Sequence, residues 1–248
     1  MSTIYILWLR QLKRYLRSRS RIIGSLGQPI LFLVALGYGF GPTYQKAGQG
    51  NYIEFLAPGI IAMSILFTAI FNGVELIWDR QFGFLKETLV APVSRLNIMI
   101  GRTVGGATVA CLQGLIVLII SLFAGFHLPN LLSMIPAFGI MFLIALLFTA
   151  LGTAIASRLE DMHGFQLIMN FLVMPLFFLS GALFPLEGLP NKILIITKLD
   201  PLSYGVDALR GVLINSSYYG LTLDILVLSV CTLVCLLIGS YLFTTTEA

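Results

Sequence analysis

The sequence predicts an all-α polytopic membrane protein with six transmembrane helices. Hydrophobic residues make up 58% of the 248 residues, charged residues make up only 10%, and the mean hydropathy is +0.95. Soluble domains carry about 25% charged residues. Apolar runs near 20 residues long recur along the chain, and a helix of that length crosses a hydrocarbon core of about 30 Å. The short alternating segments typical of a membrane β-barrel do not occur in the sequence.

Residues 1–24 are predicted to form an amphipathic helix that lies in the membrane interface. Leu9, Leu12 and Leu16 supply an apolar side, and cations on the other side face anionic headgroups. A cleaved signal peptide is a weaker alternative because the basic region is too long. A nucleic-acid patch is weaker still because a membrane span adjoins the segment. The basic residues at helical spacing are Arg10, Lys13, Arg14, Arg17 and Arg21.

Six apolar runs follow and are separated by polar turns. The third carries small residues at four-residue spacing, including Gly101, Gly105, Gly106, Ala110 and Gly114, and such residues let membrane helices approach closely. The whole chain is expected to form one transmembrane domain, 1–248. The predicted spans are residues 26–40, 58–77, 101–126, 131–156, 165–183 and 223–243.

Residues 78–102 are a polar interruption between the second and third spans. Phe84, Leu85, Thr88 and Leu89 have helical spacing, and Pro92 ends that pattern. An amphipathic helix between two spans lies at the membrane face or docks on another protein. We therefore interpret the segment as a docking site for a separate subunit. A solvated loop that only joins two spans is the alternative.

The segment 184–219, between the fifth and sixth spans, is too apolar for a loop and too interrupted for a span. Prolines interrupt it at several positions. Asp200 followed by Pro201 is typical of a helix N-cap with proline in the first turn. We predict two short re-entrant or interfacial helices there.

The basic residues are distributed unequally between the two faces of the membrane. Eleven lie in the first segment, in residues 78–102 and at Arg158, whereas the other face holds only Lys46, Lys192, Lys198 and Arg210. By the positive-inside rule, both termini and residues 78–102 are cytoplasmic, and the short helices lie on the outer side.

The sequence contains no P-loop, no HExxH and no GxSxG motif, so we expect no enzyme activity, no bound cofactor and no metal in this chain. The span interiors lack the ionisable groups that ion-coupled carriers keep near the midplane. Glu75 lies near one end of a span and Asp224 near the end of another. We expect Glu75 to reach water or to pair with a neighbour.

Two motifs resemble the permease subunits of type-2 ABC exporters, similar to the daunorubicin-resistance and nodulation-type drug and lipid exporters. The first is DRQFGFLKETLVAPVSR with the later Gly101–Arg102 step. The second is SGALFPLEGLP followed by DPLSYGVDALRG. Asp200 stands where the family more often has Asn, and both residues cap helices. The resemblance covers nearly the whole chain.

The resemblance implies a coupling helix that is seated in a separate ATPase subunit. Its docking residues would be Phe84, Leu85, Lys86, Glu87, Thr88 and Leu89, and the flanking residues would be Arg80, Gly83, Pro92, Arg95 and Arg102, with Arg95 and Arg102 near the headgroups. Two permeases, identical or related, and two ATPases would assemble in contact with membrane lipids in the bacterial cytoplasmic (inner) membrane. ATP and Mg²⁺ would bind on the partner, and no nucleic acid is involved.

On this reading the protein is the transmembrane subunit of an ATP-driven exporter of an amphipathic drug, lipid or glycan conjugate. Phe177, Phe178 and Glu75 are candidate substrate-path residues, although aromatic packing is the more common role for such phenylalanines. An ion-coupled carrier or channel that works without ATP is one alternative, and a non-transporting membrane scaffold is another.

Overall fold

The computed structural model describes residues 3–46, 50–83, 93–159 and 161–244, and these ranges contain helices and turns but no strand. Within those ranges six helical segments are long and apolar enough to cross a membrane, which confirms the predicted class. The segments are α2 (Arg19–Lys46), α3 with α4 (Tyr52–Phe71 and Val74–Gln81), α6 (Arg95–Phe123), α7 (Met134–Arg158, preceded by a 3-10 turn at Leu131–Ser133), α8 (Met162–Leu179) and α11 (Leu221–Thr244). Three shorter helices are α1 (Thr3–Arg17), α9 (Asn191–Leu199) and α10 (Pro201–Ile214).

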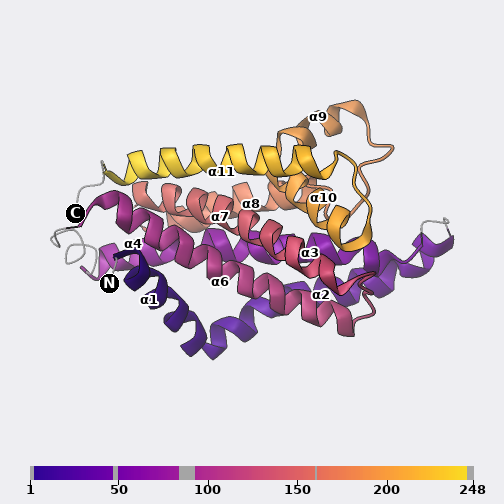
Figure 1. Ribbon diagram of the computed structural model, residues 1–248, viewed down its shortest axis with the longest axis horizontal. Coiled ribbons are helices and arrows are strands. Elements are labelled where there is room, and N and C mark those ends of the chain that lie inside the picture. The colour runs from indigo at the N-terminus through magenta and orange to yellow at the C-terminus, as the bar shows by residue number, and fades with distance from the viewer. Residues whose placement is uncertain (1–2, 47–49, 84–92, 160, 245–248) are drawn as a thin grey trace.

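Helix α3 is the centre of the bundle. Most of it is buried, and it packs against α2, α6, α7 and α10, whereas α2 and α11 are mostly exposed. Figure 1 shows the start of α1, the end of α11 and α4 at one end of the bundle, and α9 and α10 at the other. We call these the terminal end and the α10 end.

The small residues of α6 bring it close to its neighbours, as predicted. A Cβ atom on Gly114 would lie 2.6 Å from Cγ1 of Ile65 on α3, and one on Gly106 would lie 2.6 Å from Cγ2 of Thr149 on α7. Any larger side chain at these positions would push the helices apart.

Several element boundaries differ from those predicted. The first span was expected at 26–40, but α2 begins at Arg19, continues through Pro29 and Pro42 and ends at Lys46. Membrane helices tolerate proline because neighbouring groups satisfy the freed backbone atoms. The amphipathic segment was expected as one helix, but α1 ends at Arg17, and Ser18 separates it from α2.

The predicted polar interruption at 78–102 is shorter than expected because helices enter it from both sides. Helix α4 continues to Gln81, with Asp79 buried on one face. Helix α6 begins at Arg95, where the Ser94 hydroxyl accepts a hydrogen bond of 3.3 Å from the Asn97 amide. Buried contacts and this N-cap therefore extend helix into both ends of the polar interruption.

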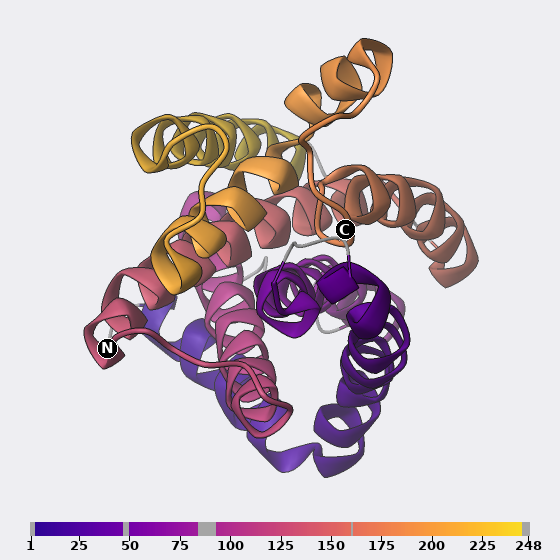
Figure 2. The same cartoon turned by 90° about the vertical axis from the view of Figure 1, so that its right-hand side faces the viewer.

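The two predicted short helices are present as α9 and α10. The Asp200 carboxylate accepts from the Leu202 amide at 2.8 Å, with Pro201 in the first turn of α10, which confirms the predicted cap. Burial raises the pKa of Asp200 to about 7. Helix α10 is packed between α3, α7 and α11, whereas α9 projects from the bundle (orange in Figure 2) with Ile195 and Leu199 exposed.

Candidate functional site

Charged side chains from four helices meet near the terminal end of the bundle. The arginines come from α1, α2 and α6, and both carboxylates come from α4. We call this group the charge cluster, and its members are Arg10, Arg14, Arg21, Asn72, Glu75, Asp79 and Arg102.

Asp79 joins α1 and α6 to α4. One carboxylate oxygen accepts from Nη2 of Arg10 at 2.9 Å, and the other accepts from Nη2 of Arg102. Asp79 is 3% exposed and Arg102 is 5% exposed. Arg102 therefore faces the protein interior, not the lipid headgroups as expected, because a carboxylate on the adjacent helix offers it a charge-assisted hydrogen bond away from water.

Glu75 joins α1 and α2 to α4. Its two oxygens accept from Nη1 of Arg21 at 2.6 Å and from Nη1 of Arg14 at 3.3 Å, and the residue is 6% exposed. Arg21 also donates to Oδ1 of Asn72 at 2.8 Å, and the Asn72 side-chain amide donates to the Gly106 carbonyl at 3.0 Å. Glu75 thus pairs with its neighbours, which is one of the two outcomes expected for it.

Helical spacing places these partners opposite one another. Glu75 and Asp79 are four residues apart on α4, and Arg10 and Arg14 are four residues apart on α1. Residues at that spacing lie on the same face of a helix. Two carboxylates one turn apart therefore meet two arginines one turn apart.

The turn at Asn72–Gly73 separates α3 from α4 and lies directly against α7. A Cβ atom on Gly73 would lie 2.5 Å from the carbonyl oxygen of Gly152 on α7. Only glycine allows this approach without displacing backbone, so the short α4 and its carboxylates are held at a fixed distance from α7.

The charge cluster contains one ion pair that is buried on both sides, Arg102 with Asp79, whereas Arg10, Arg14 and Arg21 have side chains that are 30–44% exposed. Exposed pairs contribute about 0–1 kcal/mol. Removing one partner of a buried pair costs about 3–5 kcal/mol because a charge is left uncompensated. The ion pair between α4 and α6 is therefore the strong connection, and the pairs from α4 to α1 and α2 are weaker.

Arg80, the neighbour of Asp79, points to a different helix. It donates to the carbonyl oxygens of Ser157 and Leu159, both at 2.8 Å, and so caps the end of α7. The two adjacent charged residues of the first motif therefore contact different helices. Asp79 binds arginines of α1 and α6, and Arg80 binds the end of α7.

The predicted docking residues Phe84 to Leu89, together with Pro92, lie outside the described residues, but the anchors on both sides are described. Gly83 has φ +78°, in the left-handed region that favours glycine, directly after α4 ends. On the far side Ser94 caps α6 and Arg95 is exposed in its first turn. The docking role of these residues stays a prediction.

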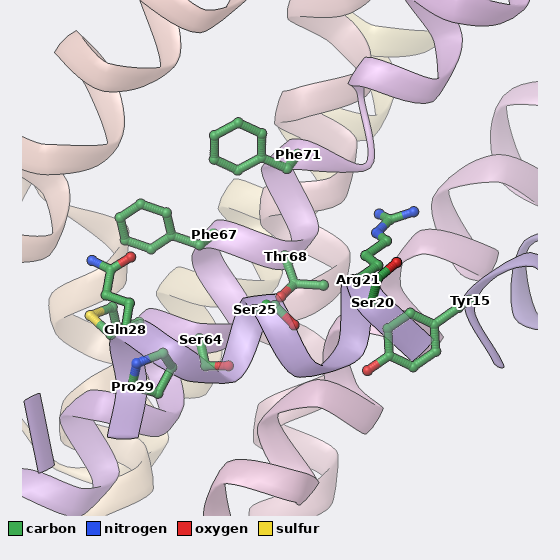
Figure 3. Close-up of a pocket in the computed structure, with 12 residues that line it drawn as sticks. Tyr15, Ser20, Arg21, Ser25, Gln28, Pro29, Ser64, Phe67, Thr68 and Phe71 are labelled. Carbon is green, nitrogen blue, oxygen red and sulfur yellow. The ribbon is translucent and has the colours of Figure 1, made fainter. Parts of the chain in front are cut away.

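A groove of about 400 Å³ lies between α2 and α3, beside the charge cluster. Figure 3 shows Ser20 and Arg21 at one end of it, Ser25, Ser64 and Thr68 in the middle, and Gln28 and Phe67 at the other end. We call it the α2–α3 groove. A second hollow of about 350 Å³ adjoins it, shares Arg21 and Phe71 with it, and reaches Glu75, Trp78 and α8.

The wall of the α2–α3 groove contains an unsatisfied hydroxyl. Ser64 is 3% exposed, and its Oγ has no hydrogen-bond partner among the described residues. Burying a hydroxyl without a partner is unfavourable. The groove also carries the polar side chains of Ser25, Gln28 and Thr68 in a mainly apolar wall, a combination that is typical of ligand sites of 300–1,000 Å³.

The two candidate substrate-path phenylalanines have different surroundings. Phe177 is 1% exposed and packs against Phe32 of α2 with ring centroids 6.0 Å apart, whereas Phe178 is 45% exposed. Phe177 joins α8 to α2, and Phe178 faces outward. A contact of either side chain with substrate stays a prediction.

The second motif forms a corner at the α10 end that is centred on Arg210. Its guanidinium donates to the carbonyl oxygens of Gly181 and Ala182 at 2.9 and 3.1 Å, and its carbon lies 3.8 Å from the centroid of the Phe55 ring. Burial lowers the pKa of Arg210 to about 10. Asp207 accepts hydrogen bonds from the Tyr218 and Tyr219 amides.

Sequence reasoning missed Asp79, Arg10, Arg14 and Asn72 as parts of one site. The paired i, i+4 spacing of acids on one helix and bases on another is a signal that could have suggested it. Which helices face each other is set by tertiary packing, and spacing alone does not give that.

The six helical segments of the described residues that are long and apolar enough to cross a membrane define a polytopic membrane protein. A family model described as ABC-2 type transporter matches residues 2–214. The chain therefore belongs to the ABC-2 type transporter family, whose members act as membrane permeases and not as enzymes.

The chain is also similar over most of its length to proteins described as putative transport permease ycf38 and nodulation protein J. The ycf38 protein of Cyanophora paradoxa is 30% identical over 222 residues, which cover 87% of this chain and 75% of the relative. Nodulation protein J of Rhizobium leguminosarum bv. trifolii is 27% identical over 213 residues, covering 85% and 78%. The ycf38 protein of Pyropia yezoensis is 31% identical over 202 residues, covering 78% and 68%.

Proposed function

We propose that this chain is the membrane-spanning subunit of an ATP-driven exporter of amphipathic compounds. The observation that carries the proposal is the charge cluster, which ties α4 to α1, α2 and α6 immediately before the segment that leads to the predicted docking residues. A force applied at residues 84–92 reaches Asp79 and Glu75 through one turn or two of helix, and from there it reaches three further helices. Family membership supports the pairing with an ATPase.

In this mechanism ATP and Mg²⁺ bind on two copies of a partner subunit, and two permease chains form the translocation path. The terminal end faces the cytoplasm and the α10 end faces outward, as the distribution of basic residues indicates. ATP-driven closure of the partner dimer moves the docked segment, and α4 transmits that movement as a rigid-body shift. The compound passes along the α2–α3 groove toward the α10 end.

The test replaces Leu85→Ala and Glu87→Ala and measures co-purification with the ATPase subunit and ATP-dependent transport in proteoliposomes. We expect both to fall at least tenfold, because a buried interface anchor contributes about 2 kcal/mol or more. Lys192→Ala, on α9 at the opposite end, is the control. Unchanged complex formation and unchanged transport in the double variant would remove the docking role. Transport driven by an ion gradient without ATP would instead establish a carrier.

A further inference from the structure

The turn between α1 and α2 carries an excess of positive charge beside the α2–α3 groove. An open hollow of about 830 Å³ is lined by Arg10, Lys13, Arg14, Arg17, Ser18, Arg19 and Ser20. We call it the basic concavity. Its size and its five cations make it the strongest concentration of one charge in the described part of the chain.

The charge cluster does not neutralise this concavity. The acids near it, Glu75 and Asp79, are already bound by arginines. Lys13, Arg17 and Arg19 are exposed, and no acidic side chain within residues 3–46, 50–83, 93–159 and 161–244 pairs with them. These three cations are therefore available to an anion from outside the chain.

The basic concavity continues into the α2–α3 groove. Ser20 lines both, and Arg21 follows it in the groove wall (Figure 3). Beyond these two residues the accessible wall is mainly apolar, with Phe67, Phe71 and Met63, and it also carries the polar side chains of Ser25, Gln28, Ser64 and Thr68. The order along the surface is thus a cationic mouth, a polar neck and a mainly apolar channel.

We propose that these two hollows form one entry site for an anionic amphiphile, a compound with a phosphate or similar anionic head on a single apolar chain. The head lies among Lys13, Arg17 and Arg19, and the chain lies in the α2–α3 groove. Charge complementarity selects this occupant, because a neutral amphiphile leaves the cations of the mouth without partners. As a statement about cargo, the inference rests on the proposed export function.

The binding test uses the purified chain in a neutral maltoside detergent and follows its unfolding midpoint as ligand is added, since a ligand that binds the folded state raises the midpoint. Dodecyl phosphate is the probe. Dodecyl phosphocholine has the same chain with a zwitterionic head, and inorganic phosphate has the head alone. We expect dodecyl phosphate to act at concentrations about tenfold lower than either comparison compound.

Two pairs of variants locate the head and the chain. Arg17→Gln with Arg19→Gln removes two exposed cations from the mouth and weakens dodecyl phosphate binding about tenfold. Lys192→Gln with Lys198→Gln removes the same charge at the α10 end and leaves binding unchanged.

Gly24→Leu tests the apolar chain. It fills the groove, where a Cβ meets nothing within 4 Å, and abolishes the advantage of dodecyl phosphate over inorganic phosphate. Gly27→Leu is equally unhindered but outside the groove lining, and it has no effect.

Three results would overturn the proposal. If inorganic phosphate alone reproduces the whole shift of the unfolding midpoint, the basic concavity binds an adventitious ion only. Equal action of dodecyl phosphocholine means that the head is not selected. A midpoint that depends on protein concentration and not on ligand means that a second copy of this chain covers the groove.

The source of the amphiphile is tested separately with the reconstituted complex. Dodecyl phosphate that stimulates ATP turnover in the parent complex, but not in the Gly24→Leu complex, supports entry of cargo. Binding without any change in ATP turnover identifies a resident membrane lipid and overturns the cargo assignment. Because the binding test needs neither ATP nor the partner, a failure of ATP-driven export leaves its result intact, and the two proposals can fail independently.

Discussion

The two ends of the bundle hold buried arginines in different ways. At the terminal end Arg102 binds a carboxylate on another helix, and Asp79 is shared with Arg10. At the α10 end Arg210 binds backbone carbonyls at the end of α8 and on α3. Side-chain partners can rotate with a moving helix and exchange, whereas backbone carbonyls move only when the chain itself moves. Because of this difference in partners, we infer that the terminal end is suited to transmitting movement and that the α10 end is fixed.

The largest expected effect comes from Arg210→Met, which keeps bulk but removes every donor. Buried carbonyls of three residues lose their partner and Asp207 loses its nearby cation, so we expect a loss of about 4–5 kcal/mol in unfolding free energy. The unfolding midpoint in detergent measures it. Lys198→Met, an exposed cation in the adjacent helix, is the control and should change stability by less than about 0.5 kcal/mol. A small effect at Arg210 would mean that the α10 end is not fixed by this residue.

The next effect comes from Asp79→Asn, which leaves Arg102 buried without a counter-charge. We expect a loss of about 3 kcal/mol, and adding Arg102→Met should restore more than half of it because both members of the pair are then neutral. A double-mutant cycle on unfolding free energy measures the coupling. The restored variant should still export poorly, because the connection from α4 to α6 is missing. Full export by the double variant would show that transmission does not use this pair.

An intermediate effect is expected from Gly73→Ala. The added Cβ would lie 2.5 Å from the Gly152 carbonyl oxygen, and the overpacking should cost about 1–3 kcal/mol. Gly27→Ala in α2 meets nothing within 4 Å and should stabilise the helix by about 0.5–1 kcal/mol. Unfolding midpoints of the two variants compare them directly. Equal midpoints would show that α4 can move away from α7 without cost.

A different kind of effect, a pH dependence, is expected at the α10 end. Burial raises the pKa of Asp200 to about 7, compared with about 3.9 in an unfolded chain. Folding therefore favours the protonated acid: the contribution to stability is fully present below about pH 4 and is lost as the pH rises to about 7. As the pH rises across that range, exchange of the backbone amide hydrogens in α9 and α10 should accelerate by more than the intrinsic exchange rate of an unprotected amide does. Asp200→Asn keeps the cap and should remove this additional dependence, and a dependence that persisted would exclude Asp200 as its origin.

The sequence was sufficient to predict the helical class, the six spans, the Asp200 cap and the close approach of α6. Each of these depends on composition or local spacing. The extension of α4 and α6 into residues 78–102 was not predicted, because Asp79 and its buried partner Arg102 lie on different helices that only tertiary packing brings together. The charge cluster was missed for the same reason: its members lie on four helices, and pairing across helices is a property of packing. The docking residues 84–89 remain predictions from the family resemblance.

The enclosed position of α3 has a consequence for how the chain tolerates mutation. Its backbone approaches other backbone at Gly59, which faces Ala182, and at Ile70, which faces Gly152, and its side chains are buried on nearly every side. A library of single substitutions should therefore lose most variants in α3, including changes between apolar residues of different size. The same library should retain most apolar exchanges in α2 and α11, whose surfaces are largely exposed. On the proposed role of the α2–α3 groove, changes to cargo preference have most room on its α2 side.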